Sequence, residues 1–424
     1  MKFIHVVLLL ACTIYVQDQP TAKASADLVH RLITALNSRN TETIRDFLKS
    51  NATTDVPLND RVDRMAGFAM QGAPFRLEAE PKVSTGEIRA VLIDKQGVSL
   101  NLAIVITESD PPKIKSVRVM PSRAVKPLGE WSDIGGLAKA LVADRGLPAM
   151  GITLVRNGNT ESAAAGVRDA GGSNPVGPDE PWSIGSIGKP ICTTVIAKLI
   201  ETGKLRWDET LKEALPGMPM RPGYETSTLE QIMKHRGGIP QDLNFSHERV
   251  VGIVGSAKTP IAMRERYCRD ILSREPIARP GQRNAYSNAG YALLGHIAER
   301  VAGKPYEVLV KELVFAPLGL KHSYTGIDTL PAARPSGHER GQGGLARANM
   351  SGPIEFLVAP AGGGMFMSTS DLARFGQEHL KGLRGVDGLL KAATVKRLHQ
   401  GLSERPGDQS FLYACGWESK QIQE

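Results

Sequence analysis

The chain has 424 residues, of which 41% are hydrophobic and 23% are charged, a balance typical of soluble globular proteins and not of disordered chains. The net charge is +8, but the sequence contains no run of five or more basic residues, no zinc-finger spacing and only 5% aromatic residues. We therefore expect no nucleic acid partner, and a basic exterior that favours anionic surfaces such as a cell envelope.

The N-terminus has the layout of a secretory signal. Lys2 precedes the apolar run FIHVVLLLACTIYV, which is too short to span a bilayer. Ala22 and Ala24 follow as the small residues of a cleavage site. The sequence predicts a signal peptide over residues 1–24 and an exported protein, periplasmic or secreted. A competing interpretation is lipidation of Cys12, the one route by which we expect membrane anchoring.

The cysteines argue against a disulfide framework or a metal site. Removal of the signal leaves three, an odd number without paired spacing, and neither CxxC nor HExxH occurs. One incidental disulfide would fit, but three small buried apolar residues fit better. These three are Cys192, Cys268 and Cys415.

Residues 25–122 are predicted to form an α+β domain. Leucines at positions 28, 32 and 36 recur at helical spacing, and Thr41 can cap a second short helix. Strict apolar alternation over residues 98–106 then predicts a strand, and a further short strand follows at 113–120. This order resembles the cone-shaped fold of the nuclear transport factor 2-like superfamily. We find no catalytic cluster here and interpret the unit as an accessory or binding domain.

Residues 123–133 form a predicted Pro-containing linker to a second domain over residues 134–424. This domain begins with the helical segment IGGLAKALVAD. Two strand-like runs around Asn157 and Gly158 then predict a β-hairpin. Helices alternate with Gly/Pro-rich loops over the rest of the chain, which favours an α+β fold with an antiparallel sheet and a helical region.

The segment PWSIGSIGKPICTTVIAKLI places Ser186 three residues before Lys189. Apolar residues at helical spacing predict a helix that begins near Ser186: Val195, Ile196, Leu199 and Ile200. The first backbone N–H groups of a helix favour negative charge, and a spacing of three places both side chains on one face. A lysine whose pKa is lowered by burial or by a nearby cation can activate a serine.

A structural interpretation is the default for this pair taken alone. About one or two Ser-x-x-Lys matches are expected by composition in a chain of this length, and this chain has one. Ser186 could cap the helix while Lys189 is an ordinary solvated side chain. The pair alone does not decide between these interpretations.

A second cluster, Tyr286-Ser287-Asn288, follows a predicted turn at Pro280-Gly281. Tyr286 and Asn288 project to the same side of an extended segment. A phenol near a lysine can shuttle a proton, and an amide can bind both a lysine and a substrate amide. Alone, the cluster also fits a buried tyrosine beside a turn asparagine.

Together the clusters resemble the serine β-lactamase and penicillin-binding protein superfamily, specifically the class C-like serine hydrolases. SIGSIGKP is similar to the nucleophile motif of that family, and the only Tyr-x-Asn of this chain follows about a hundred residues later. TLEQIMKHRGGIP resembles the family's His-Thr-Ser-Gly-Leu segment, although Arg236 and Gly237 replace its Thr and Ser. FAPLGLKHSYT and APAGGGMFMSTSDLARF also match, so the resemblance covers about residues 134–417.

The resemblance implies roles for four residues. Ser186 would attack a carbonyl carbon and form an acyl-enzyme, and its backbone N–H would donate to the oxyanion. Lys189 would take the hydroxyl proton, with Tyr286 assisting as base and protonating the leaving group. Asn288 would orient Lys189 and the substrate. Water would release the acid, so no cofactor is implied.

The family's third element, a strand bearing Lys or His followed by Gly, has no match at its expected position after YACGWESKQIQE. His399-Gln400-Gly401 fits the letters but precedes that strand, and we reject it as the motif. We expect a truncated or frame-shifted form of a longer enzyme, with unpaired sheet edges and an incomplete oxyanion site.

The sequence thus predicts an exported serine hydrolase acting on an ester, a β-lactam or a D-amino-acid peptide. The substrate would be a small molecule or resemble peptidoglycan. The alternative is a catalytically inactive binding protein of the same fold, which the missing third motif favours and the four matched site residues oppose. The oligomeric state stays open.

Overall fold

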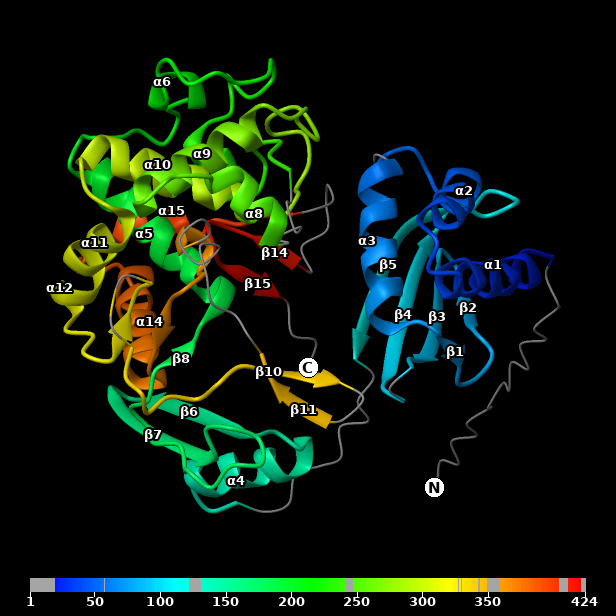
Figure 1. Cartoon of the computed structure of the whole chain (residues 1–424), viewed down its shortest axis with the longest axis horizontal. Coiled ribbons are helices and arrows are strands. Elements are labelled where there is room, and N and C mark those ends of the chain that lie inside the picture. The colour runs from blue at the N-terminus through cyan, green and yellow to red at the C-terminus, as the bar shows by residue number, and fades with distance from the viewer. Residues whose placement is uncertain are drawn as a thin grey trace, which may run out of the picture. The chain divides into compact units, whose positions relative to one another are not determined.

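The computed structural model describes residues 20–424 except 57, 96, 122–130, 241–246, 327, 329, 342–343, 349–358, 404–410 and 421–424. The apolar run of the predicted signal, Cys12 and most of the predicted linker lie outside the described residues. The chain divides into two compact units, residues 1–127 and 128–424 (Figure 1). Among the described residues, no helix is long and apolar enough to cross a membrane.

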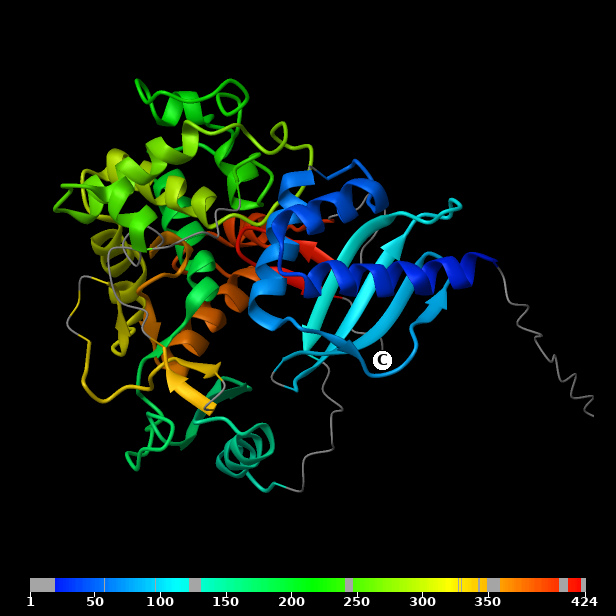
Figure 2. The same cartoon turned by 45° about the vertical axis from the view of Figure 1, so that its right-hand side comes forward.

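The first unit packs three helices with a five-stranded antiparallel sheet of order β1-β3-β4-β5, in which β2 also pairs with β3. In Figure 2, helix α1 crosses one face of this sheet. The helices are α1 (Pro20–Asn37), α2 (Thr41–Asn51) and α3 (Leu58–Gly72). The strands are β1 (Arg76–Leu77), β2 (Lys82–Ser84), β3 (Glu87–Ile93), β4 (Ser99–Ile106) and β5 (Ile114–Pro121).

The apolar periodicities of the first unit place its core as the sequence predicts. The helical leucines at 28, 32 and 36 are buried in the same core cluster as alternate residues of β4, namely Leu102, Ile104 and Ile106. The predicted cap of α2 is wrong by one residue. Asn40 is the N-cap and its side chain accepts from the N–H groups of Glu42 and Thr43, so Thr41 is the first helical residue.

The second unit is built around two central helices, α5 (Gly188–Glu201) and α10 (Asn288–Ala302), which pack against each other. Most side chains of both helices are buried. In the described part of this unit the other helical elements are α4 (Ile134–Arg145), η1 (Gly185–Ile187), α6 (Leu211–Ala214), α7 (Leu229–Met233), α8 (His247–Val254), α9 (Pro260–Leu272), α11 (Tyr306–Val310), η2 (Lys311–Phe315), α12 (Ala316–Leu318), η3 (Ala359–Ala361), α14 (Thr369–Leu383) and α15 (Ala392–Leu398).

The strands that the structure describes in this unit form four small antiparallel sheets: β6-β7, β8-β12-β9, β10-β11 and β13-β14-β15. Their bounds are β6 (Ala149–Arg156), β7 (Asn159–Gly166), β8 (Trp182–Ser183), β9 (Ser323–Tyr324), β10 (His338–Gly341), β11 (Gly344–Arg347), β12 (Phe366–Met367), β13 (Leu402–Ser403), β14 (Phe411–Tyr413) and β15 (Glu418–Lys420).

The predicted hairpin is β6-β7. Asn157 and Gly158 both have positive φ, at 51° and 82°, as a two-residue turn of matching twist requires. Among the described residues these two strands pair only with each other. The expectation of a truncated sheet with unpaired edges stays a prediction. Cys192, Cys268 and Cys415 are all buried free thiols, as expected.

Two glycines let distant segments reach the start of α5. Gly362 has φ +105°, and a Cβ there would lie 1.6 Å from the carbonyl oxygen of Gly185. Gly416 has φ +86°, and a Cβ there would lie 2.7 Å from the backbone nitrogen of Pro190. Because only glycine permits such contact, the loop after η3 and the turn between β14 and β15 both close on the first turn of α5.

Candidate active site

Ser186 lies in η1, the single 3-10 turn that leads directly into α5. Gly185, with φ +50°, makes the bend that turns the chain from β8 into this helix. Ser186 is exposed at the N-terminal end of the helical segment. Its hydroxyl caps neither η1 nor α5, because neither helix has a side-chain cap. The interpretation of Ser186 as a simple helix cap is therefore wrong.

Lys189 is buried, with 1% of its surface exposed. Its Nζ lies 3.0 Å from Ser186 Oγ, 2.8 Å from Asn288 Oδ1 and 3.3 Å from the carbonyl oxygen of Ala361. Lys189 is thus not the solvated surface lysine of the structural interpretation. It is enclosed by α5, α10 and η3, and its Nζ contacts the serine hydroxyl from the protein interior.

Tyr286 and Asn288 reach the site from the start of α10. Ser287 is the N-cap of that helix, and its hydroxyl accepts the N–H of Gly290. The extended residue before the cap directs the Tyr286 hydroxyl to 2.6 Å from Ser186 Oγ. The structure therefore brings all four predicted site residues together around one hydroxyl oxygen.

Burial decides the protonation states in this cluster. Desolvation lowers the pKa of Lys189 to about 7, only partly opposed by the nearby Cys192. Desolvation also raises the pKa of Tyr286 above its ordinary value, and Glu418 adds to this effect, although the hydrogen bond to Ser186 opposes it. At pH values between these two ranges the amine is neutral while the phenol keeps its proton.

A neutral Lys189 satisfies every hydrogen bond of the cluster. The charged ammonium donates from Nζ to Ser186 Oγ, Asn288 Oδ1 and the carbonyl of Ala361. The neutral amine keeps two N–H groups for Asn288 and Ala361, which leaves its lone pair for the Ser186 hydroxyl. The Tyr286 hydroxyl donates to the same serine oxygen. This arrangement can remove a proton from Ser186 and can supply a different proton from the opposite side.

The sequence did not identify two further groups at the site. The carbonyl of Ala361 belongs to the segment APAGGG, but a backbone acceptor has no sequence signal. His235 belongs to the segment MKHRGGIP and packs against Tyr286, with ring centroids 4.4 Å apart and the ring planes tilted by 46°. The resemblance of this segment to a family motif could have indicated that His235 lies near the site, but no role for its side chain followed from the sequence.

His399 lies away from this cluster, in agreement with its rejection as a third motif. It is the C-cap of α15, and its ring packs on Trp417 with centroids 4.3 Å apart. Its Nε2 lies 3.1 Å from Nδ1 of the buried His379, which in turn contacts Thr194 of α5.

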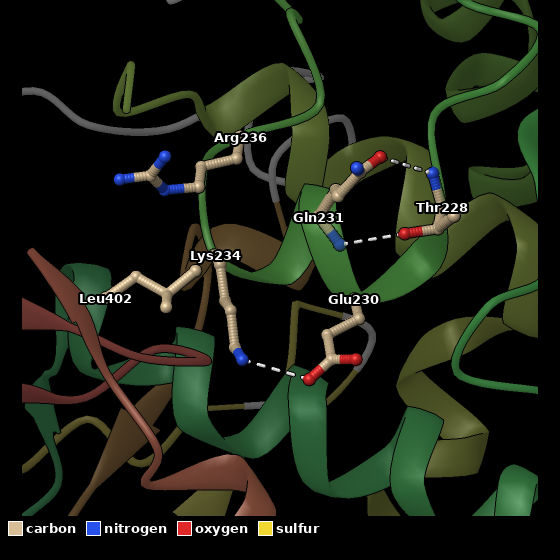
Figure 3. A pocket seen from close by; sticks show the side chains of 6 residues that line it. All are labelled: Thr228, Glu230, Gln231, Lys234, Arg236 and Leu402. Carbon is tan, nitrogen blue, oxygen red and sulfur yellow. Dashed lines mark hydrogen bonds and ion pairs between the residues drawn. The ribbon is translucent and has the colours of Figure 1, made fainter. Parts of the chain in front are cut away.

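A separate pocket opens beside α7 (Figure 3). Within it Lys234 and Glu230 point toward each other and form an ion pair at 2.9 Å. The lining residues are Thr228, Glu230, Gln231, Lys234, Arg236 and Leu402. None of the four predicted site residues lines this pocket. In the described part of the chain, no group of three or more His, Cys, Asp or Glu could hold a metal ion.

A family model described as Beta-lactamase matches residues 134–422. The chain therefore belongs to the β-lactamase family, whose members are serine hydrolases that include peptidases, amidases and β-lactamases. The match begins at the first residue of α4 and includes all four residues of the site.

Similar proteins carry names from the same family. "Penicillin-binding protein 4" of Amycolatopsis lactamdurans is 26% identical over 285 residues, 66% of this chain and 71% of the relative. A "Putative D-alanyl-D-alanine carboxypeptidase" of Escherichia coli is 31% identical over 134 residues, only 30% of either protein. The solved structure of an octameric penicillin-binding protein homologue from Pyrococcus abyssi matches with a TM-score of 0.53 and 25% identity, over 65% of this chain and 62% of that one.

Proposed function

We propose that the protein is a serine hydrolase that works through an acyl-enzyme formed on Ser186. The observation that carries this proposal is the placement of Ser186 Oγ between Lys189 Nζ at 3.0 Å and the Tyr286 hydroxyl at 2.6 Å. A buried amine with a pKa of about 7 is a base suited to neutral pH.

In acylation, Ser186 Oγ attacks the substrate carbonyl carbon while its proton passes to Lys189 Nζ. The N-terminal end of η1 and α5 favours the negative charge that develops on the carbonyl oxygen, and the Ser186 N–H is one donor to it. The bond to the leaving group then breaks, and that group takes the Tyr286 proton. The proton that Lys189 took from Ser186 then replaces the one that Tyr286 gave to the leaving group, so both groups return to their starting protonation states.

Water completes the cycle by attacking the acyl carbon, so that the acid leaves and Ser186 regains its proton. The raised pKa of Tyr286 supports its assignment as the proton donor, with Lys189 as the principal base. This division of labour sharpens the sequence-based prediction, which left the roles of the two residues shared.

The proposed substrates are esters, β-lactams or D-amino-acid peptides, including peptidoglycan-like ones. Support comes from the family and from relatives named as a penicillin-binding protein and a carboxypeptidase. We also propose membership of the class C-like branch, export to the periplasm or exterior, and an accessory first unit with a cone-like fold. These finer assignments rest on the sequence motifs and on the order of elements in the first unit.

The test is covalent labelling, which reports nucleophilicity directly and does not depend on turnover. A fluorophosphonate or a fluorescent penicillin is incubated with the protein, and intact and peptide mass spectrometry locates the adduct. We expect one adduct, on Ser186, and none in Ser186→Ala. A protein that acquires no adduct would instead fit the alternative of an inactive binding protein of the same fold.

A further inference from the structure

The segment that replaces the family's Thr and Ser with Arg236 and Gly237 is joined to the chain before Tyr286 by backbone hydrogen bonds. The N–H of Ala285 donates to the carbonyl of His235 at 2.8 Å. The N–H of Gly281 donates to the carbonyl of Arg236 at 2.7 Å. These bonds fix residues 281–285 against the stretch that follows α7.

His235 also binds the residue on the other side of Tyr286. The N–H of Ser287 donates to Nδ1 of His235 at 3.2 Å, and the Ser287 hydroxyl donates to the carbonyl of Pro240 at 2.6 Å. His235 therefore holds both chain neighbours of Tyr286, one through its carbonyl and one through its ring.

The imidazole ring is the centre of an aromatic wall. Its centroid lies 4.4 Å from the ring of Tyr286, 4.6 Å from Tyr413 and 5.2 Å from Tyr291. Lys189 Nζ lies 4.5 Å and 5.4 Å from the centroids of Tyr286 and Tyr291 on the same wall. The His235 ring thus packs against Tyr286 and Tyr291, the two aromatic side chains that cover the Lys189 amine.

The backbone and charge of His235 suit this place. Its φ of +56° lies in the left-handed region, in which asparagine, aspartate and histidine are enriched among residues other than glycine. Burial lowers its pKa to about 3, and Lys189 adds to this effect. The ring is therefore neutral at physiological pH, with its proton on Nε2 because Nδ1 accepts the Ser287 N–H.

We propose that His235 is a positioning residue that holds Tyr286 against Ser186 and keeps water away from Lys189. The titratable groups that face this wall are Tyr286 from the segment before α10, Tyr291 from α10, Tyr413 and Glu418 from the β14-β15 hairpin, and Lys189 and Cys192 from α5. Without the ring, water reaches Lys189 and the desolvation that keeps it neutral is lost. This inference rests on the proposed function only for its effect on rate.

The experiment measures the Lys189 titration and the labelling of Ser186 in the full chain. Lysines are labelled with ¹³C at Cε, and Lys189→Met assigns the signal. In His235→Ala we expect the titration midpoint to rise from about 7 by at least about one pH unit, because water reaches the amine. We expect phosphonylation of Ser186 to slow by roughly 10- to 100-fold, because Tyr286 loses its fixed position.

The variant His235→Asn is included because His235→Ala could fail to fold. Its Oδ1 can accept the Ser287 N–H, and asparagine tolerates positive φ, but the aromatic ring is gone. We expect the midpoint to rise here too, with a smaller loss of labelling rate. The matched control is His379→Ala, which removes another buried histidine that contacts α5 but not Tyr286, and should leave the midpoint near 7.

A double-mutant cycle separates positioning from general loosening. In a Tyr286→Phe background, at a pH above the Lys189 midpoint of both proteins, His235→Ala should slow labelling little further, since the hydroxyl that His235 positions is already absent. An unchanged Lys189 midpoint in either His235 variant would overturn the proposal. If the wild-type protein is not labelled at all, the proposed hydrolase function fails, whereas the Lys189 titration still decides the role of His235.

Discussion

Lys189 and Arg264 are two buried basic residues of the second unit whose hydrogen-bond partners differ in charge. Arg264 is fully buried and pairs with the carboxylates of Glu299 and Glu307. Lys189 is as deeply buried, but its hydrogen-bond partners are the neutral oxygens of Ser186, Asn288 and Ala361. No carboxylate pairs with it among the described residues.

The difference in partners produces opposite charge states. Burial alone would lower the pKa of Arg264, but Glu307 and Glu299 raise it above its ordinary value, so the guanidinium stays charged. For Lys189 burial dominates, and its pKa falls to about 7. A buried cation with carboxylates is a structural element, whereas one without them becomes a neutral amine and hence a base.

The largest expected effects fall on the Lys189 cluster. Ser186→Ala should abolish labelling, and Lys189→Met should slow it by roughly 10²- to 10⁴-fold, because the serine loses its base. Labelling rates with a fluorophosphonate measure both. Lys198→Met is the matched control on the same helix, where Nζ binds the carbonyl of Leu389, and it should retain the wild-type rate. A similar loss of labelling rate in Lys198→Met would contradict the assignment of Lys189 as the specific base.

Arg264→Met should act on stability and spare the chemistry. Two carboxylates are then left buried without their cation, which costs about 3–5 kcal/mol of unfolding free energy. Urea denaturation measures this loss. The folded fraction, labelled below the onset of unfolding, should keep its pH dependence. A shift in that dependence would show that the two clusters are coupled.

The pH dependence of labelling tests the neutral-amine state. The pKa of Lys189 is lowered, so the amine is charged and inactive below about 7 and becomes competent as pH rises through that value. At pH 6 the rate should be roughly tenfold below its plateau. A stopped assay from pH 5 to 9 measures the profile. A rate that is flat across this range contradicts the assignment of Lys189 as base.

The smallest effect is expected for an exposed ion pair. Lys304 and Glu312 lie 2.7 Å apart, and both side chains are about half exposed. Lys304→Ala should change the unfolding free energy by at most about 1 kcal/mol, because solvent screens such pairs. The difference between the unfolding free energies lost in Arg264→Met and in Lys304→Ala measures how much burial adds to the cost of removing a cation.

Sequence patterns predicted the elements whose physics is local. The periods of 3.6 and 2 residues located α1, β4 and α5, and the Asn-Gly pair located the β6-β7 turn. The cap of α2 was missed by one residue, since Asn40 and Thr41 are both acceptable cap residues and only the backbone distinguishes them.

The candidate site was predictable in part. Ser186, Lys189, Tyr286 and Asn288 were found by motif and order, and the structure brings them together. The contribution of Ala361 comes from a backbone carbonyl, which leaves no trace in the side chains. The part played by His235 depends on a left-handed backbone and on three rings that converge from separate segments. Such long-range packing has no periodicity that a sequence can reveal.

The most direct test of the central claim is the titration of Lys189 itself. In protein labelled with ¹³C at the Cε of lysine, the signal absent from Lys189→Met is followed from pH 5 to 11. Burial without a carboxylate partner predicts a midpoint near 7. A midpoint near the ordinary lysine value of about 10.4 would contradict the account, because Lys189 would then be a cation at neutral pH and could not take the proton of Ser186.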